Sequence, residues 1–290
     1  MNRSADIDAF LQAAGWDMAQ RAPLAGDAGN RKYERLIHPK KGPAILMDAD
    51  PISGEDIQPF LNIAAHLKGC DLSAPEIYAA NHSLGLILLE DFGDQLLFDV
   101  ANTIPELEYP LYQLCLDALA QLHQKPPPPK VGSYFPQAMA QAAEITLQWY
   151  CSPDIAAAVA TELRQHLDSL DWTHPVLVLR DYHAQNVVYR PEQSGTAQIG
   201  LLDFQDAQLG HPLYDAASLI NDARRSLHPD VELRLKDTLV QTYAGTDGFH
   251  RALSTLSAQR NLRVLALFAR LCLRDGKPEY LKLMPRVWNN

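Results

Sequence analysis

Hydrophobic positions change their spacing along this chain, and the change divides it into two parts. In the first hundred residues, helical spacing of three and four residues alternates with extended stretches bounded by turn-forming residues. We predict helices over Asp6–Ala14 and Pro59–Lys68, and strands that include Ala44–Met47 and Leu84–Leu89. Strands with one helix among them are typical of a small mixed lobe with a largely antiparallel sheet.

Helical spacing dominates after Asp94. Two short apolar runs, Val176–Leu179 and Ile199–Leu202, interrupt it and are predicted to be strands. We therefore predict an α+β fold of two lobes, residues 1–94 and 95–290, with a hinge near Glu90–Asp94 and a ligand cleft between the lobes. The predicted helices of the larger lobe are Leu107–His123, Tyr134–Tyr150, Ile155–Leu170, Leu213–Arg224, Val231–Tyr243 and Phe249–Leu273.

Each of the two short apolar runs is followed by an aspartate. RDYHAQN, which contains Asp181 and Asn186, follows the first run, and LLDFQD places Asp203 at the end of the second. In phosphoryl transfer, one carboxylate orients the attacking hydroxyl, while an amide and a second carboxylate hold the Mg²⁺ that neutralises the nucleotide phosphates. A loop aspartate alone more often only forms a turn. The order and spacing of the three residues therefore carry the prediction.

Composition narrows the classes of partner. The chain has 35 acidic and 25 basic side chains and a formal net charge of -10, which argues against nucleic acid or a membrane surface as partner. Its four cysteines form no CxxC pair, which favours a reducing compartment over disulfides or zinc. No stretch approaches the ~20 apolar residues of a membrane span. We expect a cytoplasmic protein with no obligate protein partner.

Longer stretches of the chain resemble the aminoglycoside phosphotransferase family, the small-molecule branch of the protein-kinase-like fold. They span nearly the whole sequence, and the last two are similar to the bacterial anomeric kinases that act on N-acetylmuramate and N-acetylglucosamine in peptidoglycan recycling. The matching stretches are Leu24–Leu36, Ile87–Asp94, Leu179–Tyr189, Gly200–Arg225 and Val264–Trp288.

The resemblance implies that ATP and Mg²⁺ are the cofactors, with ATP between the lobes. It implies Asp181 as the catalytic base and Asn186 and Asp203 as the metal ligands. The hairpin Gly26–Tyr33 would cover the phosphates through backbone N–H groups, and the backbone of Leu89–Phe92 would meet the adenine. The candidate nucleotide contacts are Gly26, Asp27, Ala28, Gly29, Asn30, Arg31, Lys32, Glu90, Asp91 and Phe92.

Two further residues, Asp215 and Asp48, lie outside the trio of Asp181, Asn186 and Asp203. The resemblance implies that Asp215 is a buried structural residue that hydrogen-bonds the catalytic loop. The usual kinase also carries a lysine on its third strand that contacts the phosphates, whereas Asp48 lies at that place here. We hypothesise that Arg31 or Lys32 supplies the missing positive charge; the alternative is that both are solvated.

The acceptor is expected to be a hydroxyl within hydrogen-bond reach of Asp181. The implied reaction is ATP- and Mg-dependent phosphorylation of a sugar, in particular the anomeric hydroxyl of the two amino sugars, which is acidic enough for an aspartate base. An aminoglycoside or another small alcohol as acceptor stays open, and so does a pseudokinase that binds nucleotide without transfer. The candidate substrate contacts are Tyr182, His183, Gln205, Asp206, Arg224 and Arg225.

Overall fold

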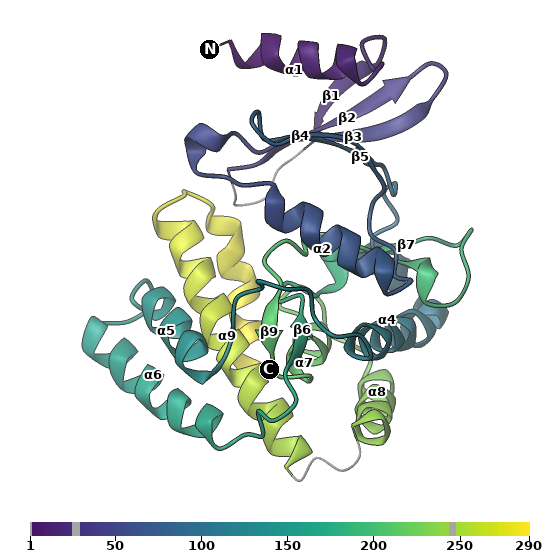
Figure 1. Cartoon of the computed structure of the whole chain (residues 1–290). Helices are drawn as coiled ribbons and strands as arrows, with labels where there is room; N and C mark the ends of the chain where they lie inside the picture. The colour runs from purple at the N-terminus through teal and green to yellow at the C-terminus, as the bar shows by residue number, and fades with distance from the viewer. Residues whose placement is uncertain (1, 25–29, 244–247) are drawn as a thin grey trace.

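The structure, a computed structural model, describes residues 2–24, 30–243 and 248–290. It has two lobes, as predicted: a twisted sheet flanked by helices, at the top of Figure 1, and a larger helical part below it. The two-lobed α+β prediction is therefore confirmed.

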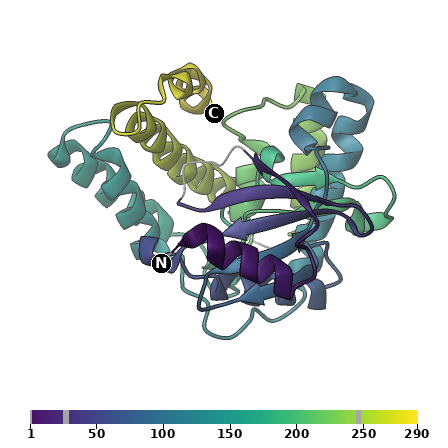
Figure 2. The ribbon, with the colours of Figure 1, turned by 90° about the horizontal axis from the view of Figure 1, so that it is seen from above.

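The smaller lobe is built on a five-stranded antiparallel sheet in the order β1-β2-β3-β5-β4. Helices α1 and α2 lie on its opposite faces, and Figure 2 shows α1 across the sheet from above. The elements are α1 (Arg3–Ala13), β1 (Gln20–Leu24), β2 (Lys32–His38), β3 (Gly42–Asp48), α2 (Gln58–Gly69), β4 (Ile77–Asn81) and β5 (Leu86–Glu90), with a 3-10 turn at Pro51–Ser53.

Side chains alternate between the two faces of the sheet along the central strands, which explains why helices pack on both faces. On β3, Leu46 packs with Ile7 and Phe10 of α1, while its neighbour Met47 packs with Phe60 of α2. Successive side chains of a strand point to opposite faces, so each face of the sheet receives its own apolar set. One of these clusters, on the α2 side, continues into the larger lobe.

The larger lobe is mainly helical. Its longest helix, α9, packs against α5, α6 and α7. The helices are α3 (Leu97–Thr103), α4 (Glu108–His123), α5 (Pro136–Leu147), α6 (Pro153–Asp168), α7 (Tyr214–Ile220), α8 (Pro229–Thr242), α9 (Phe249–Leu273) and α10 (Met284–Asn289), with 3-10 turns at Pro105–Leu107, Ala184–Asn186, Gly195–Gln198 and Pro278–Leu283. In the described part of the chain, none of them has both the length and the hydrophobicity of a membrane span.

Both predicted strands of the larger lobe exist, but they do not pair with each other. β6 (Val176–Val178) pairs with β9 (Gln208–Gly210), and β8 (Ile199–Leu201) pairs with β7 (Val187–Tyr189). The sequence pattern did not predict β7 or β9, because neither lies in a four-residue apolar run like those that include β6 and β8. The two short ribbons hold the segment between β6 and β7 and the segment between β8 and β9.

The helix predicted over Leu213–Arg224 is shorter in the structure, where α7 ends at Ile220. The Asp222 carboxylate accepts a hydrogen bond from the backbone N–H of Arg224 at 2.8 Å. Such local bonds give the backbone an alternative to the helical ladder. The chain after Ile220 therefore forms a turn beside the segment that follows β6.

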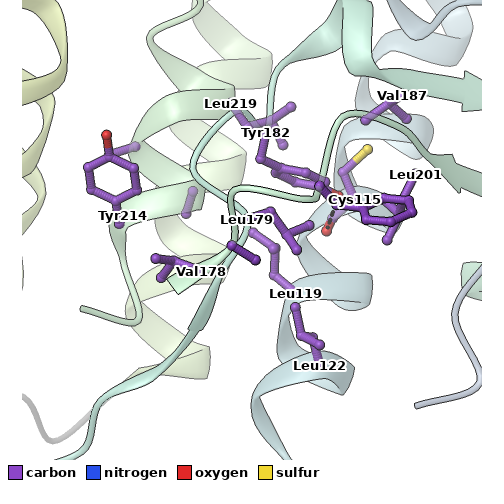
Figure 3. Packing of buried hydrophobic residues seen from close by; sticks show 14 of the residues in the cluster. Cys115, Leu119, Leu122, Val178, Leu179, Tyr182, Val187, Leu201, Tyr214 and Leu219 are labelled. Carbon is purple, nitrogen blue, oxygen red and sulfur yellow. Dashed lines mark hydrogen bonds between the residues drawn. The ribbon is translucent and has the colours of Figure 1, made fainter. Parts of the chain in front are cut away.

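A continuous apolar core lies under this segment. Figure 3 shows Leu119 and Leu122 of α4 close to Leu179, and Tyr182 pointing toward Cys115. The same core includes residues of α2 and β5 from the smaller lobe. The division at residues 94 and 95 falls between β5 and α3 and stays a prediction.

Candidate active site

Asp181 and Asn186 lie in the loop after β6, and Asp203 lies in the segment after β8. The fold brings these three predicted residues of the phosphoryl-transfer site together. Arg180 has φ 72 and Asp203 has φ 55, a left-handed conformation that is uncommon outside glycine. The side-chain amide of Asn186 donates to the backbone carbonyl of Asp181 at 2.9 Å and to the Asp203 carboxylate at 3.3 Å. Segments that are 17 positions apart in sequence thus form one polar cluster.

The residues around Asp203 fit a bound divalent cation. Burial raises the pKa of the Asp203 carboxyl, and the nearby charges of Asp181 and Asp206 raise it further, against the effect of Gln205 and Arg31. A cation would relieve this repulsion. Among the described residues, no three acidic, histidine or cysteine side chains form a complete cage, but Mg²⁺ commonly takes one or two protein oxygens and completes its shell with phosphates and water.

Gln205 holds the Asp203 carboxylate in place. Its amide donates to Oδ1 of Asp203 at 2.6 Å, and its side chain is buried. Asn186 binds the other oxygen, Oδ2. Both oxygens of the predicted metal ligand are therefore oriented by amide groups before any cation binds.

Two buried aspartates fix the backbone of the predicted catalytic loop, the segment that follows β6, from either end. Asp215, which is 0% exposed, accepts from the backbone N–H groups of Leu179 at 2.6 Å and Arg180 at 2.9 Å. Burial raises the pKa of Asp215 to about 7, although the two N–H donors favour its ionised form. Asp222 accepts from the N–H of Ala184 at 3.1 Å. Sequence reasoning missed Asp222, although it lies in the same resembling stretch as Asp215.

On its other side, Asp181 faces a basic side chain. Nη2 of Arg263, on α9, lies 3.7 Å from Oδ1 of Asp181, whose side chain is 36% exposed. Nη1 of Arg263 donates to the Tyr134 hydroxyl at 2.7 Å. Arg260, one helical turn earlier, is buried and donates to the backbone carbonyl of Asn221 at 3.3 Å. The predicted base therefore has arginine side chains on this side, in addition to the carboxylates of Asp203 and Asp206 nearby.

Tyr134 lies between two arginines, Arg263 and Arg180. The guanidinium of Arg180 is 4.7 Å from the centre of its ring, within cation–π range. Burial acts to raise the pKa of the Tyr134 hydroxyl, but Arg263 and Arg180 outweigh it and the pKa is lowered. Sequence reasoning missed Arg263, because the spacing over Phe249–Leu273 signals only a core helix.

The predicted phosphate-covering hairpin lies between β1 and β2, where Leu24 pairs with Tyr33. Gly26, Asp27, Ala28 and Gly29 lie outside the described residues, and Asn30 is exposed. Arg31 forms an ion pair with Glu55, with Nε and Oε2 2.8 Å apart. Lys32 is exposed and pairs with Asp48 in the sheet register.

At the predicted hinge, side chains are engaged with the protein. Glu90 pairs with Arg190 at 2.9 Å, and Asp91 pairs with Arg35 at 2.7 Å. The Arg190 guanidinium lies 4.2 Å from the centre of the Phe92 ring. That ring also requires Gly200, since a Cβ there would lie 2.7 Å from it. The contact of the hinge backbone with a nucleotide stays a prediction.

Two predicted substrate contacts have polar groups that are engaged elsewhere in the protein. Tyr182 is buried in the core and its hydroxyl donates to the backbone carbonyl of Cys115 at 3.0 Å (Figure 3). Arg225 is buried, pairs with Glu108 at 2.5 Å and donates to Asn102 at 2.9 Å, so it ties α3 to α4. Both polar groups are satisfied away from Asp181, and their contact with an acceptor stays a prediction.

The other four predicted contacts lie near the cluster. His183 is buried, and burial lowers the pKa of its imidazole to about 4, so it is neutral at pH 7. Asp206 is exposed and close enough to raise the pKa of Asp203. The half-buried Arg224 makes no side-chain hydrogen bond or ion pair within the described residues and lies close enough to lower the pKa of His183. Their roles toward a substrate, with that of Gln205, stay predictions.

Comparison with known proteins gives consistent results. Residues 20–266 match the family model "Phosphotransferase enzyme family". An N-acetylmuramate/N-acetylglucosamine kinase of Caulobacter vibrioides is 33% identical, over 99% of this chain and 90% of the relative. Choline kinase LicA from Streptococcus pneumoniae has the same fold, with a TM-score of 0.72 at 12% identity and complete coverage of both chains.

A further structural relative contains a nucleotide analogue. Amicoumacin kinase hAmiN, solved with AMP-PNP and Ca²⁺, has a TM-score of 0.65 at 13% identity, over 99% of this chain and 96% of its own. A family match over most of the chain agrees with the site geometry and the two-lobed fold. The chain therefore belongs to the phosphotransferase enzyme family, as a kinase of the protein-kinase-like fold.

Proposed function

We propose that this kinase uses ATP and Mg²⁺ to phosphorylate the anomeric hydroxyl of N-acetylmuramate or N-acetylglucosamine. The name of the full-length relative from Caulobacter vibrioides supports this class of acceptor. The structural observation that carries the proposal is the pairing of Asp181 with Arg263 at 3.7 Å. It suits an acceptor that is neutral or negatively charged.

In this proposal Asp181 accepts the proton of the acceptor hydroxyl. An anomeric hydroxyl is more acidic than an ordinary alcohol, so an ionised aspartate is a sufficient base. Arg263 would orient the carboxylate of Asp181. Asn186 and Asp203 would hold Mg²⁺, which supplies the positive charge that phosphoryl transfer requires. Asp215 and Asp222 already hold the backbone of the loop after β6, and Gln205 holds the Asp203 carboxylate. The groups that act on the substrate are therefore largely in position before it binds.

The arginines on one side of Asp181 argue against a polycationic aminoglycoside that would bind on that side. Arg260 and Arg263 are both largely buried beside the loop. A substrate ammonium ~4 Å from one of these guanidinium groups would be repelled by about 4 kcal/mol near a protein surface. An acceptor without positive charge avoids this penalty.

The free cysteines and the proposed use of ATP also support a cytoplasmic location. Small molecules are the proposed partners, namely the sugar and the nucleotide.

The test is turnover of each acceptor by the purified protein with ATP and Mg²⁺. We expect both amino sugars to be phosphorylated, and phosphorus NMR to show coupling of the new phosphate to the anomeric proton. Asp181→Asn should lower kcat by roughly 10²–10⁴-fold and keep ATP affinity. Turnover of an aminoglycoside instead would overturn the choice of acceptor, and ATP binding without turnover of any acceptor would favour a pseudokinase.

A further inference from the structure

The third strand cannot supply the phosphate-binding cation in this protein. Asp48 lies at the end of β3 and, two positions from Leu46, on the same face as α1. It is paired there with Arg3 of α1. The carboxylate is therefore engaged on the face of the sheet opposite to α2 and the larger lobe.

Arg31 lies on the other face. It is two positions before Tyr33, which packs against the cluster shared by α2 and the larger lobe. The side chain of Arg31 is only 20% exposed and that of its partner Glu55 only 19%. The Asp206 charge acts to raise the pKa of Arg31, so this cation lies within electrostatic range of the predicted metal site.

The ion pair leaves part of the guanidinium for a ligand. Glu55 binds Arg31 through Nε, so the two terminal nitrogens are not used by that carboxylate. A guanidinium presents its donors in a planar fork that matches two oxygens of a phosphate. Glu55 precedes α2, the helix that packs under the sheet, by three residues. In ordinary kinases the glutamate of the lysine–glutamate pair comes from a helix.

We propose that the Arg31–Glu55 pair takes the place of the missing lysine–glutamate pair. Arg31 would contact the β- and γ-phosphates, and Glu55 would be a positioning residue that holds the Arg31 side chain in the cleft. Lys32 is not required, because it is exposed and adjacent to Asp48 in the sheet. This inference rests on the proposed use of ATP.

Nucleotide binding can test the pair without any measurement of turnover. We would titrate the protein with ATP in Mg²⁺ and with AMP, which lacks the β- and γ-phosphates, by isothermal calorimetry. Charge-assisted hydrogen bonds of 1.5–3 kcal/mol correspond to roughly 10–100-fold in affinity. Arg31→Gln should therefore weaken ATP binding about 10–100-fold and AMP binding far less. Glu55→Gln should weaken ATP binding in the same direction, by a smaller factor.

The double variant Arg31→Gln/Glu55→Gln should bind ATP no more weakly than Arg31→Gln alone, because Glu55 acts through Arg31. The matched control is Arg21→Gln, which removes another arginine–glutamate pair of the same sheet, with Nε of Arg21 2.6 Å from Glu34. It should leave both affinities unchanged.

Unchanged ATP affinity in Arg31→Gln would overturn the inference and leave the proposed function standing. An equal loss for ATP and AMP would also overturn it, since it would show a structural effect rather than a phosphate contact. Absence of ATP binding by the wild-type protein would instead overturn the proposed function, and this inference with it.

Discussion

The guanidinium of Arg263 and the carboxylate of Asp181 lie 3.7 Å apart, on α9 and on the catalytic loop. The two residues are distant in sequence and no local pattern connects them. Their contact joins the longest helix of the protein to the predicted base, and α9 thereby becomes part of the site. Several measurable consequences follow from this and from the other buried polar contacts.

Arg263→Gln should lower kcat by roughly 5–10-fold, since an ion pair of this length on a partly exposed carboxylate contributes about 1 kcal/mol. The conservative Arg263→Lys should restore part of the activity. The control is Arg164→Gln, which removes an exposed pair with Asp168 on α6. Full activity of Arg263→Gln would contradict a role for Arg263 in orienting Asp181.

Binding of Mg²⁺ and ATP together should weaken on acidification at a higher pH than an ordinary aspartate would produce. Burial, followed by the charges of Asp181 and Asp206, raises the pKa of Asp203, and only the ionised carboxylate can hold the cation. A raised pKa therefore moves the loss of binding upward in pH. Titrations with ATP in Mg²⁺ between pH 5 and pH 8 would measure this. Asp203→Asn should abolish the magnesium dependence of ATP binding, and a persistent dependence would contradict the assignment.

Asp222→Ala should reduce both stability and activity. It leaves the buried N–H of Ala184 without its acceptor, at a cost of about 1–3 kcal/mol. Urea unfolding would measure the stability change, and kcat the displacement of the loop. Asp230→Ala, at an exposed acid at the start of α8, is the control. If Asp222→Ala lowered stability and left kcat intact, Asp222 would have no part in positioning the loop.

The folded state should lose stability as the pH falls from about 6.5 to about 4. Burial lowers the pKa of His123, His183 and His211 to about 4 each. In this window the unfolded chain binds protons that the folded chain does not, so stability rises with pH. Asp215, with its pKa raised to about 7, and Asp203, whose pKa is also raised, have the opposite sign, but three histidines outweigh two aspartates.

Urea midpoints measured across that pH window test this expectation. His211→Gln should reduce the dependence, whereas His82→Gln, at an exposed site, should not. Stability that is flat or rises on acidification would show that these histidines are accessible to protons in the folded state.

The sequence by itself determined the two-lobe fold and the phosphoryl-transfer trio. Helical spacing over Phe249–Leu273 and alternation in the first lobe are periodic over enough residues to be read directly. Asp181, Asn186 and Asp203 are held by two nearby segments, so their relation is visible as local spacing. The resemblance carried the expectation that Asp215 is buried beneath the loop.

Only the tertiary structure decided the partners of each buried charge. It placed the polar groups of Tyr182 and Arg225 in the core, where Cys115 and Glu108 satisfy them. It added Arg263 from α9, whose amphipathic pattern signals packing and not chemistry. Contacts across long sequence separations leave no period along the chain, since they depend on how helices and loops pack together. For that reason the polar contacts around Asp181 became visible only in three dimensions.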